Sequence, residues 1–141
     1  MINLSGAGIL FTMADDVIPI VAAVDDDFRV RESITSLLES AGYAPVAFSS
    51  AEEFLQSGTL AVATCVITDI RMPGMDGIEL QRRIRLERPA LPVILITAHY
   101  NAEVRQTAID EGAVDVLYKP FDAANLLKII QSALTNSREL Q

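Results

Sequence analysis

The sequence predicts a three-layer α/β domain, a doubly wound (βα)5 fold in which helices cover both faces of one five-stranded parallel sheet. Short runs rich in valine and isoleucine recur along the chain, and longer segments with helical spacing separate them. The short runs lack the apolar–polar alternation of a strand with one wet face, so both faces are expected to be buried. Strands that alternate with helices imply right-handed crossovers and therefore parallel pairing.

Five apolar runs are the strand candidates, and polar turns bound each of them. Their length and their content of β-branched residues favour strands over helices. No internal repeat accompanies them, so all five are expected to belong to one sheet. The candidates are Ile20–Val24, Val46–Phe48, Val62–Thr68, Val93–Thr97 and Val114–Tyr118.

The helices between these strands are predicted from their caps and stops. Gly42 ends the first helix. Ser50, with Glu53 three positions later, is a capping-box signature for the second. The third stops before Pro89, because the residue before a proline disfavours helical backbone. Asp122 is the expected cap of the fifth helix.

The apolar faces of these helices differ in width. The first and fifth have broad faces, whereas the fourth, from 101 to 111, has a thin stripe that predicts weak anchoring. The apolar positions are Val30, Ile34, Leu37, Leu38 and Ala41 in the first helix; Ile78 and Ile84 in the third; Val104, Ala108 and Ile109 in the fourth; and Leu126, Leu127, Ile130, Ala133 and Leu134 in the fifth.

Length and composition bound the kind of protein. The 141 residues, half of them apolar and 21% charged, suit one compact domain, predicted at residues 19–136. We expect a flexible extension at residues 1–18 and a tail or the start of a linker at residues 137–141. The chain start lacks the basic segment of a signal peptide, which favours a cytoplasmic location. No apolar run approaches the ~18 residues of a membrane span.

Charge and cysteine content exclude further classes. Eleven Lys and Arg residues against nineteen Asp and Glu residues give a net charge of −8. Such a surface repels nucleic acid, so direct nucleic-acid binding by this domain is not expected. The single cysteine, Cys65, permits neither an internal disulfide nor a cysteine-based zinc site, and we expect it to be buried as a small apolar residue.

Polar residues follow the predicted strands where the strands end. Asp25, Asp26 and Asp27 follow the first strand, Asp69 the third, Thr97 ends the fourth and Lys119 follows the fifth. Because the carboxyl ends of parallel strands meet at one edge, these side chains are expected to share a cleft.

Clustered carboxylates repel one another unless a cation offsets their charge. Oxygen ligands on loops suit Mg²⁺, and a lysine and a hydroxyl beside a carboxylate describe a phosphoryl-transfer site with an aspartate nucleophile. Taken singly, each residue also has an ordinary interpretation: Asp27 as a helix cap, Thr97 as a packed strand residue and Lys119 as a solvated side chain. Their joint occurrence favours the site.

The segment from Thr68 to Gly77, TDIRMPGMDG, closely resembles the phosphoacceptor loop of response-regulator receiver domains, the CheY-like family with a flavodoxin-like fold. The acidic pair Asp25-Asp26, the motif Ile96-Thr97-Ala98 and the motif from Tyr118 to Phe121, YKPF, extend the resemblance over about residues 20–134. The four motifs are specific because they occur together and in order. The loop most resembles that of FixJ/NarL-type receivers, which are attached to helix-turn-helix transcription factors.

The resemblance implies a role for each matched position. Asp69 would accept a phosphoryl group from a sensor histidine kinase. Asp25 and Asp26, one directly and one through water, would hold Mg²⁺ together with Asp69 and the backbone carbonyl of Arg71. Lys119 would pair with the phosphoryl oxygens, and Thr97 would move to bond them. The bond before Pro120 would be cis, as a cis X–Pro bond is inexpensive.

Three positions bear on switching and lifetime. The family commonly has Tyr or Phe three residues before the lysine, and this chain has Val116, so the usual aromatic switch cannot operate in its standard form. Arg71 and His99 flank the path of the water that would hydrolyse the acyl phosphate, so they are candidates for tuning its lifetime, with ordinary loop residues as the alternative. Tyr118 and Tyr100 lie nearby in the sequence.

The resulting interpretation is a phosphorylation-operated switch of a two-component system and not a classical enzyme, although it would catalyse its own phosphorylation and slow hydrolysis. Its partners would be the kinase, a DNA-binding effector domain outside this chain, and a second copy through the face of the fourth helix and fifth strand. Tyr100, Arg105 and Asp115 are the candidates for that face.

Three alternatives fit the sequence less well. A haloacid-dehalogenase-type phosphatase needs a second Asp two residues after the first, where this chain has Arg71. A flavodoxin-like mononucleotide binder would place phosphate beside Asp25, Asp26 and Asp27, which repel it. A receiver used only for docking would not need the complete acceptor set found here.

Overall fold

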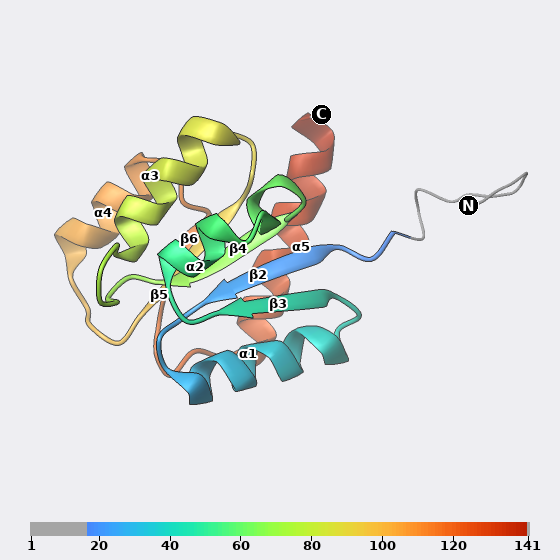
Figure 1. Ribbon diagram of the computed structural model, residues 1–141, viewed down its shortest axis with the longest axis horizontal. Coiled ribbons are helices and arrows are strands. Elements are labelled where there is room, and N and C mark those ends of the chain that lie inside the picture. The colour runs from blue at the N-terminus through green and yellow to red at the C-terminus, as the bar shows by residue number, and fades with distance from the viewer. Residues whose placement is uncertain (1–16, 141) are drawn as a thin grey trace, which may run out of the picture.

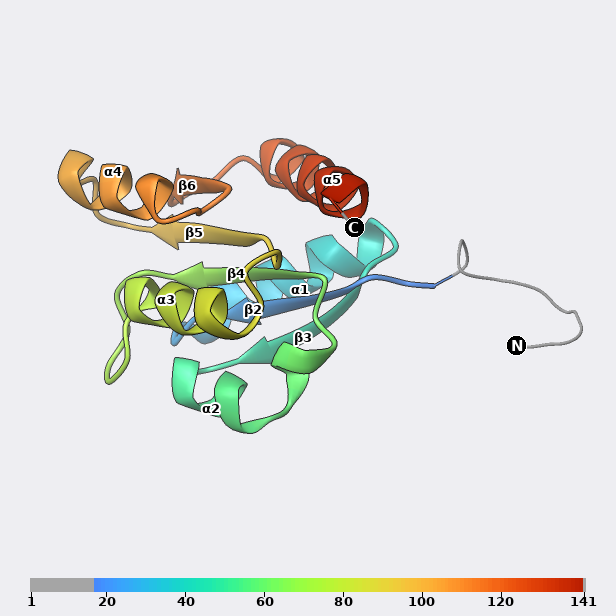
Figure 2. The same cartoon turned by 90° about the horizontal axis from the view of Figure 1, so that it is seen from above.

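The computed structural model describes residues 17–140. The extension expected at residues 1–18 therefore lies almost wholly outside the described residues. Within them the chain forms one five-stranded parallel sheet and five α-helices (Figure 1), which confirms the predicted fold class. In Figure 2 the strands lie in the order β3-β2-β4-β5-β6 from bottom to top. They are β2 (Ile20–Val24), β3 (Ala44–Phe48), β4 (Cys65–Asp69), β5 (Val93–Thr97) and β6 (Asp115–Tyr118).

The helices pack in two layers, one on each face of the sheet. Ile34 and Leu38 of the first helix share a buried cluster with Leu126 and Ile130 of the last. The three middle helices contribute to the opposite cluster, for example through Phe54, which is fully buried. The helices are α1 (Phe28–Ser40), α2 (Ala51–Gln56), α3 (Gly77–Glu87), α4 (Ala102–Asp110) and α5 (Ala123–Leu140).

The central strands are buried on both faces, as the lack of alternation predicted. Successive residues of β2 enter opposite clusters: Val21 lies on the side of α1 and α5, and Ala22 on the side of α2, α3 and α4. Cys65 and Val66 of β4 alternate in the same way. A sheet covered on both sides leaves only the ends of its strands to carry polar groups.

The structure corrects two expectations about strands. The third predicted strand begins at Cys65 and not at Val62, because a 3₁₀ turn at Thr59–Ala61 precedes it and leaves Val62 57% exposed. The second, β3, is an edge strand and is not buried on both faces, since Val46 is 37% exposed. An apolar run identifies a strand without showing where in the sheet it lies.

Local signals account for the helix ends. The Asp27 carboxylate accepts a hydrogen bond from the Arg29 N–H at the start of α1, and Gly42 beyond its end has a φ of 89°. Ser50 Oγ accepts from the Glu53 N–H, as in a capping box. The Glu53 carboxylate, however, accepts from the N–H of Ser49 and not from that of Ser50, so only half of the box forms.

The fourth helix has the thin core contact that its sequence predicted. Of its residues only Ala108 is buried, while Val104 and Ile109 are partly buried. Its second half is joined to α3 by a hydrogen bond from Gln81 Nε2 to the Ala108 carbonyl. The C-terminal helix α5 continues to Leu140, through most of the segment predicted as a tail or linker. No helix within residues 17–140 has the length and apolar character needed to cross a membrane.

Candidate functional site

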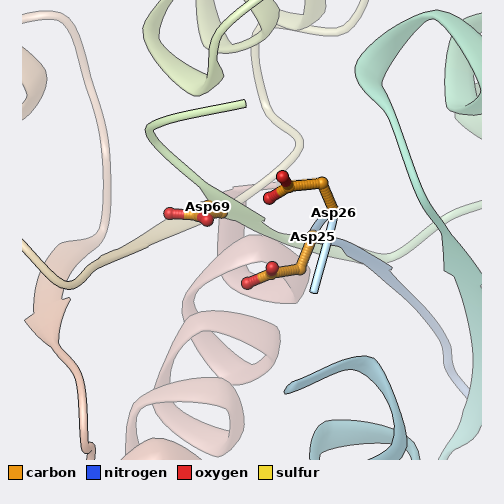
Figure 3. A group of neighbouring side chains, drawn as sticks. All are labelled: Asp25, Asp26 and Asp69. Carbon is orange, nitrogen blue, oxygen red and sulfur yellow. The ribbon is translucent and has the colours of Figure 1, made fainter. Parts of the chain in front are cut away.

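Three carboxylates meet at the C-terminal edge of the sheet. Asp25 and Asp26 follow β2, and Asp69 is the last residue of the neighbouring strand β4. One carboxylate oxygen from each lies within 4.8 Å of those of the other two, and Figure 3 shows the groups converging. Asp25 and Asp69 are buried, whereas Asp26 is exposed, so the cluster opens to solvent on one side.

Lys119 joins two of these carboxylates. Its Nζ lies 2.9 Å from Asp25 Oδ2 and 3.2 Å from Asp69 Oδ2. The lysine follows β6, and its backbone N–H donates to the carbonyl of Thr97 at the end of β5, which fixes the position of its side chain at the site. The peptide between Lys119 and Pro120 is cis. One cation thus bridges two of the three carboxylates, those of Asp25 and Asp69.

The backbone around Asp25 is held firmly. Its N–H donates to the Phe48 carbonyl of the edge strand, and its Oδ1 accepts from the N–H of Asp27. A guanidinium nitrogen of Arg31, one turn into α1, lies 2.7 Å from the Asp25 carbonyl oxygen. Asp27 itself points away from the cluster and caps α1, so the ordinary interpretation of that residue is correct.

The pKa values at the site reflect burial opposed by pairing. Burial, followed by the charge of Asp25, raises the pKa of Asp69 above its ordinary 3.8, although Lys119 opposes the shift. Burial alone would lower the pKa of Lys119, but its contacts with Asp25 and Asp69 outweigh that effect and raise the pKa above 10.5. Lys119 is therefore cationic at neutral pH, and Asp69 ionises less readily than an ordinary aspartate.

Thr97 lies at the same edge but its hydroxyl is engaged elsewhere. It ends β5, is 3% exposed and accepts a hydrogen bond from the His99 N–H at 3.1 Å. The contacts of the described residues include none between this hydroxyl and Asp69. The side chain of His99 is exposed. The structure therefore places Thr97 beside the site with its hydroxyl bonded to its own loop.

The loop between Asp69 and α3 depends on two glycines. Gly77 is the first residue of α3, and a Cβ there would clash with the Asp69 carbonyl oxygen and lie 2.9 Å from Ile70 Cα. Gly74 has a φ of 76°, and a Cβ there would lie 2.5 Å from Glu52 Oε2. Gly77 therefore allows two backbone segments to approach in a way that any other residue would block, whereas at Gly74 the positive φ is what favours glycine. Arg71, near the start of the loop, is exposed.

Val116 occupies the position at which the resemblance leads us to expect an aromatic residue. Val116 is buried, and a cavity of about 40 Å³ is lined by residues that include Thr97, Val116 and Tyr118. The rings of Tyr118 and Tyr100 lie 5.2 Å apart, and Tyr100 is 71% exposed. The Arg105 guanidinium binds the Val116 carbonyl and, at 3.3 Å, Asp115 of the same chain.

Sequence reasoning missed three residues that shape the site. Gly77, Arg31 and Glu52 contact the backbone of Asp69, the carbonyl of Asp25 and the N–H of Met75, respectively. The glycine that opens a helix after an aspartate cap was a usable signal for a close approach. No comparable signal marked Arg31 and Glu52, because a charged residue on a helix is usually solvated.

The donor set fits a hard divalent cation. Carboxylate oxygens on two adjoining strand ends are the ligands that Mg²⁺ prefers, and the exposed side of the cluster leaves room for the waters that this ion keeps. Burying Asp25 and Asp69 together also leaves a negative charge that a cation would offset. A carboxylate flanked by a cation site, a lysine and a hydroxyl can perform phosphoryl transfer.

Fold and site together define a signalling receiver. The family model described as "Response regulator receiver domain" matches residues 21–131, so the chain belongs to the receiver domains of two-component response regulators. This confirms the resemblance drawn from the motifs.

Several known proteins are similar to the chain. The transcriptional regulatory protein FixJ of Bradyrhizobium diazoefficiens is 38% identical over 114 residues, covering 81% of this chain and 56% of FixJ. The DNA-binding transcriptional regulator NtrC of Klebsiella pneumoniae is 37% identical over 118 residues, covering 84% and 25%. A receiver domain protein of Clostridium thermocellum superposes with a TM-score of 0.83 and 30% identity, covering 88% of this chain and all of that one.

These relatives differ in length from the chain. It spans about half the length of FixJ and a quarter of NtrC, both described as transcriptional regulators. The structural match to the Clostridium protein covers that chain completely. The shared part is thus the receiver domain, the part that the fold and site define here.

Proposed function

We propose that Asp69 accepts a phosphoryl group from a phosphohistidine of a sensor kinase, in the presence of Mg²⁺, and that the modified domain then binds its partners differently. The observation that carries this proposal is the buried Asp69 carboxylate, which lies within 4.8 Å of two further carboxylates and shares Lys119, at 3.2 Å, with one of them. A carboxylate placed only for stability would not need two further acids beside it.

The chemistry uses one carboxylate oxygen of Asp69 as the nucleophile. It attacks phosphorus, the P–N bond to the donor histidine breaks, and the electron pair of that bond returns to the imidazole. Asp25, Asp26, Asp69 and the Arg71 carbonyl would hold Mg²⁺, which would neutralise charge on the phosphoryl oxygens when bound. Lys119 neutralises it from the other side. Slow hydrolysis by water then returns the carboxylate.

The reporting of the phosphoryl group begins with Thr97. To donate to a phosphoryl oxygen on Asp69, its hydroxyl must give up the hydrogen bond that it donates to the His99 carbonyl at 3.4 Å. That change alters the loop that leads into α4, whose small buried face makes it the least anchored helix of the described chain. Val116 cannot act as an aromatic switch, so the signal passes through this loop and α4. Arg71 and His99, both exposed beside the site, tune the access of the hydrolytic water.

The partners follow from the same proposal. A sensor histidine kinase supplies the phosphoryl group, and a DNA-binding effector domain, as the descriptions of the FixJ and NtrC relatives suggest, receives the signal. A homodimer would use the face of α4 and β6. Tyr100 is exposed on that face, while Arg105 and Asp115 pair with each other within the chain and would have to exchange partners to bridge two copies.

The experiment is intact-mass measurement after incubation with acetyl phosphate and Mg²⁺. We expect a gain of one phosphoryl group in the parent, and no gain in Asp69→Asn or when EDTA replaces Mg²⁺. Asp27→Asn is the matched control, because Asp27 follows the same strand but caps α1, and it should be phosphorylated as the parent is. Equal gain in the parent and in Asp69→Asn would refute the assignment of the acceptor. No gain in the parent from either acetyl phosphate or a phosphorylated histidine kinase would refute the function.

A further inference from the structure

The first turn of α2 contains two adjacent glutamates with different contacts. Glu53 serves its own helix: its N–H donates to Ser50 Oγ, and its carboxylate accepts from the Ser49 N–H at 2.7 Å. Glu52 instead reaches a loop 23 residues further along the chain, where its Oε2 accepts a hydrogen bond from the Met75 N–H at 2.8 Å. Glu53 therefore makes a local contact at the start of its own helix, whereas Glu52 makes a long-range contact.

The contact of Glu52 falls on the loop that follows Asp69. The ends of this loop are fixed by backbone bonds, from the Ile70 N–H to Ile96 and from the Gly77 N–H to Ile70. Between these ends, the Glu52–Met75 bond is the one hydrogen bond by which the described structure joins residues 72–75 to another element. The middle of the loop is therefore held from α2.

Gly74 shows that this contact is built closely into the loop. Its positive φ turns the chain under the Glu52 carboxylate, and a Cβ at this position would lie 2.5 Å from Oε2 and 3.4 Å from Oε1. The hydrogen bond from the Met75 N–H is the main cause that lowers the pKa of Glu52, so the side chain accepts it as an anion. The α2 helix is itself anchored by the fully buried Ala51 and Phe54.

We infer that Glu52 is a positioning residue of the acceptor site, which holds the loop after Asp69 in the conformation that presents the Arg71 carbonyl to the metal. This inference rests on the proposed function. Glu52 touches neither the metal nor the phosphoryl group. It acts by restricting a loop whose free movement would cost entropy each time the cation binds.

The test compares Glu52→Ala and Glu52→Gln with Glu53→Ala, all in the full chain. Three properties are measured: the exchange rate of the Met75 amide proton by NMR in metal-free protein, the Kd for Mg²⁺ by titration calorimetry, and the free energy of unfolding in urea. Glu53→Ala removes the carboxylate that accepts from the Ser49 N–H at the start of the same helix and leaves the contact with Met75, so it reports what weakening α2 alone does.

We expect Glu52→Ala to accelerate Met75 exchange and to weaken Mg²⁺ binding by about tenfold, the scale on which groups that orient metal ligands act. Glu52→Gln keeps an acceptor oxygen and should lie between Glu52→Ala and the parent. Glu53→Ala should leave both properties within twofold of the parent, even if its stability falls.

Three results would overturn the inference: unchanged Met75 exchange in Glu52→Ala, faster exchange with unchanged Mg²⁺ affinity, or an equal loss of affinity in Glu53→Ala. Failure of the proposed function is a separate outcome, since a parent that neither binds Mg²⁺ nor takes up a phosphoryl group would show it before any variant is compared.

Discussion

Replacing Asp69 by Asn should make the metal-free protein more stable at neutral pH. Asp69 has a carboxylate oxygen within 4.8 Å of one from Asp25, so at an effective dielectric constant of about 20 their repulsion is at least about 3 kcal/mol. The attraction to Lys119 at 3.2 Å is about 5 kcal/mol on the same scale. The attraction exceeds this lower bound on the repulsion by about 2 kcal/mol. The repulsion from Asp26, also within 4.8 Å, narrows that margin, so the cost of burying the charge decides the sign.

That cost favours the neutral side chain. Desolvation of a buried ion is worth several kcal/mol, and it is reduced here because the cluster opens to solvent at Asp26. We therefore expect Asp69→Asn to be more stable than the parent by about 1–2 kcal/mol at pH 7.5 in EDTA. The pKa of Asp69, which is raised first by burial and then by Asp25, indicates the same: the folded protein is more stable when this side chain is neutral.

The pH dependence follows from the same shift. Because the folded-state pKa of Asp69 lies above its ordinary 3.8, its contribution to stability is complete below 3.8 and is lost as the pH rises through the folded-state pKa. The advantage of Asp69→Asn should therefore shrink as the pH is lowered, because the carboxyl of the parent becomes neutral as well. Mg²⁺ should stabilise the parent more than the variant, because the variant has one ligand charge fewer.

The assay is urea unfolding of parent and variant in EDTA at several pH values from just below 3.8 up to 8, repeated at pH 7.5 with saturating Mg²⁺. The reasoning is wrong if Asp69→Asn is less stable than the parent in EDTA at pH 7.5. It is also wrong if the difference stays constant over the whole pH range.

Three further predictions concern packing. Gly77→Ala should lower the free energy of unfolding by about 1–3 kcal/mol despite the better helix propensity of alanine, because its Cβ meets the backbone of Asp69 and Ile70; an increase in the urea midpoint would contradict this. Phe54→Ala should cost about 3–5 kcal/mol, since the ring is fully buried and packs edge-on against Phe48 at 5.4 Å; a loss below about 1 kcal/mol in the same assay would show that the core refills the space. Burial raises the pKa of the Cys65 thiol to about 12 from 9.0, so Cys65 should react with a thiol reagent only in denaturant, and its contribution to stability, complete below pH 9.0, should be lost as the pH rises toward 12; rapid labelling of the native protein would contradict its burial.

The fold was predictable because its strands are buried. A strand that has a strand on each side and helices over both faces is shielded from water, so it must be a short apolar run. One such strand, β5, was predicted to the residue, from Val93 to Thr97. Order within the sheet is not encoded in this way. Nothing in the run that contains Val46 distinguishes an edge strand from a central one, and its exposure follows from its position beside β2 alone.

The residues of the site were predictable for a related reason, because strand ends are where a covered sheet must place its polar groups. Their neighbours were less so. Glu52 and Glu53 are identical in type and adjacent, and their contacts diverge because the helix directs one toward its own start and the other across to Met75. The spacing from Ser50 marks Glu53 as the residue that returns to the helix start, but only the packing of α2 brings Glu52 to Met75. The contacts of the Thr97 hydroxyl with the His99 backbone are likewise a property of the folded loop.

The ion pairs of Lys119 have a consequence for how the domain is made. The lysine lies 50 residues after Asp69, and it reaches the site only because β6 adds to the sheet beside β5. A chain that has emerged from the ribosome only as far as α4 contains all three acids but lacks the cation that pairs two of them. Fragments that end before β6 should therefore carry no working acceptor, and competence for phosphorylation arises only after the last strand has joined the sheet.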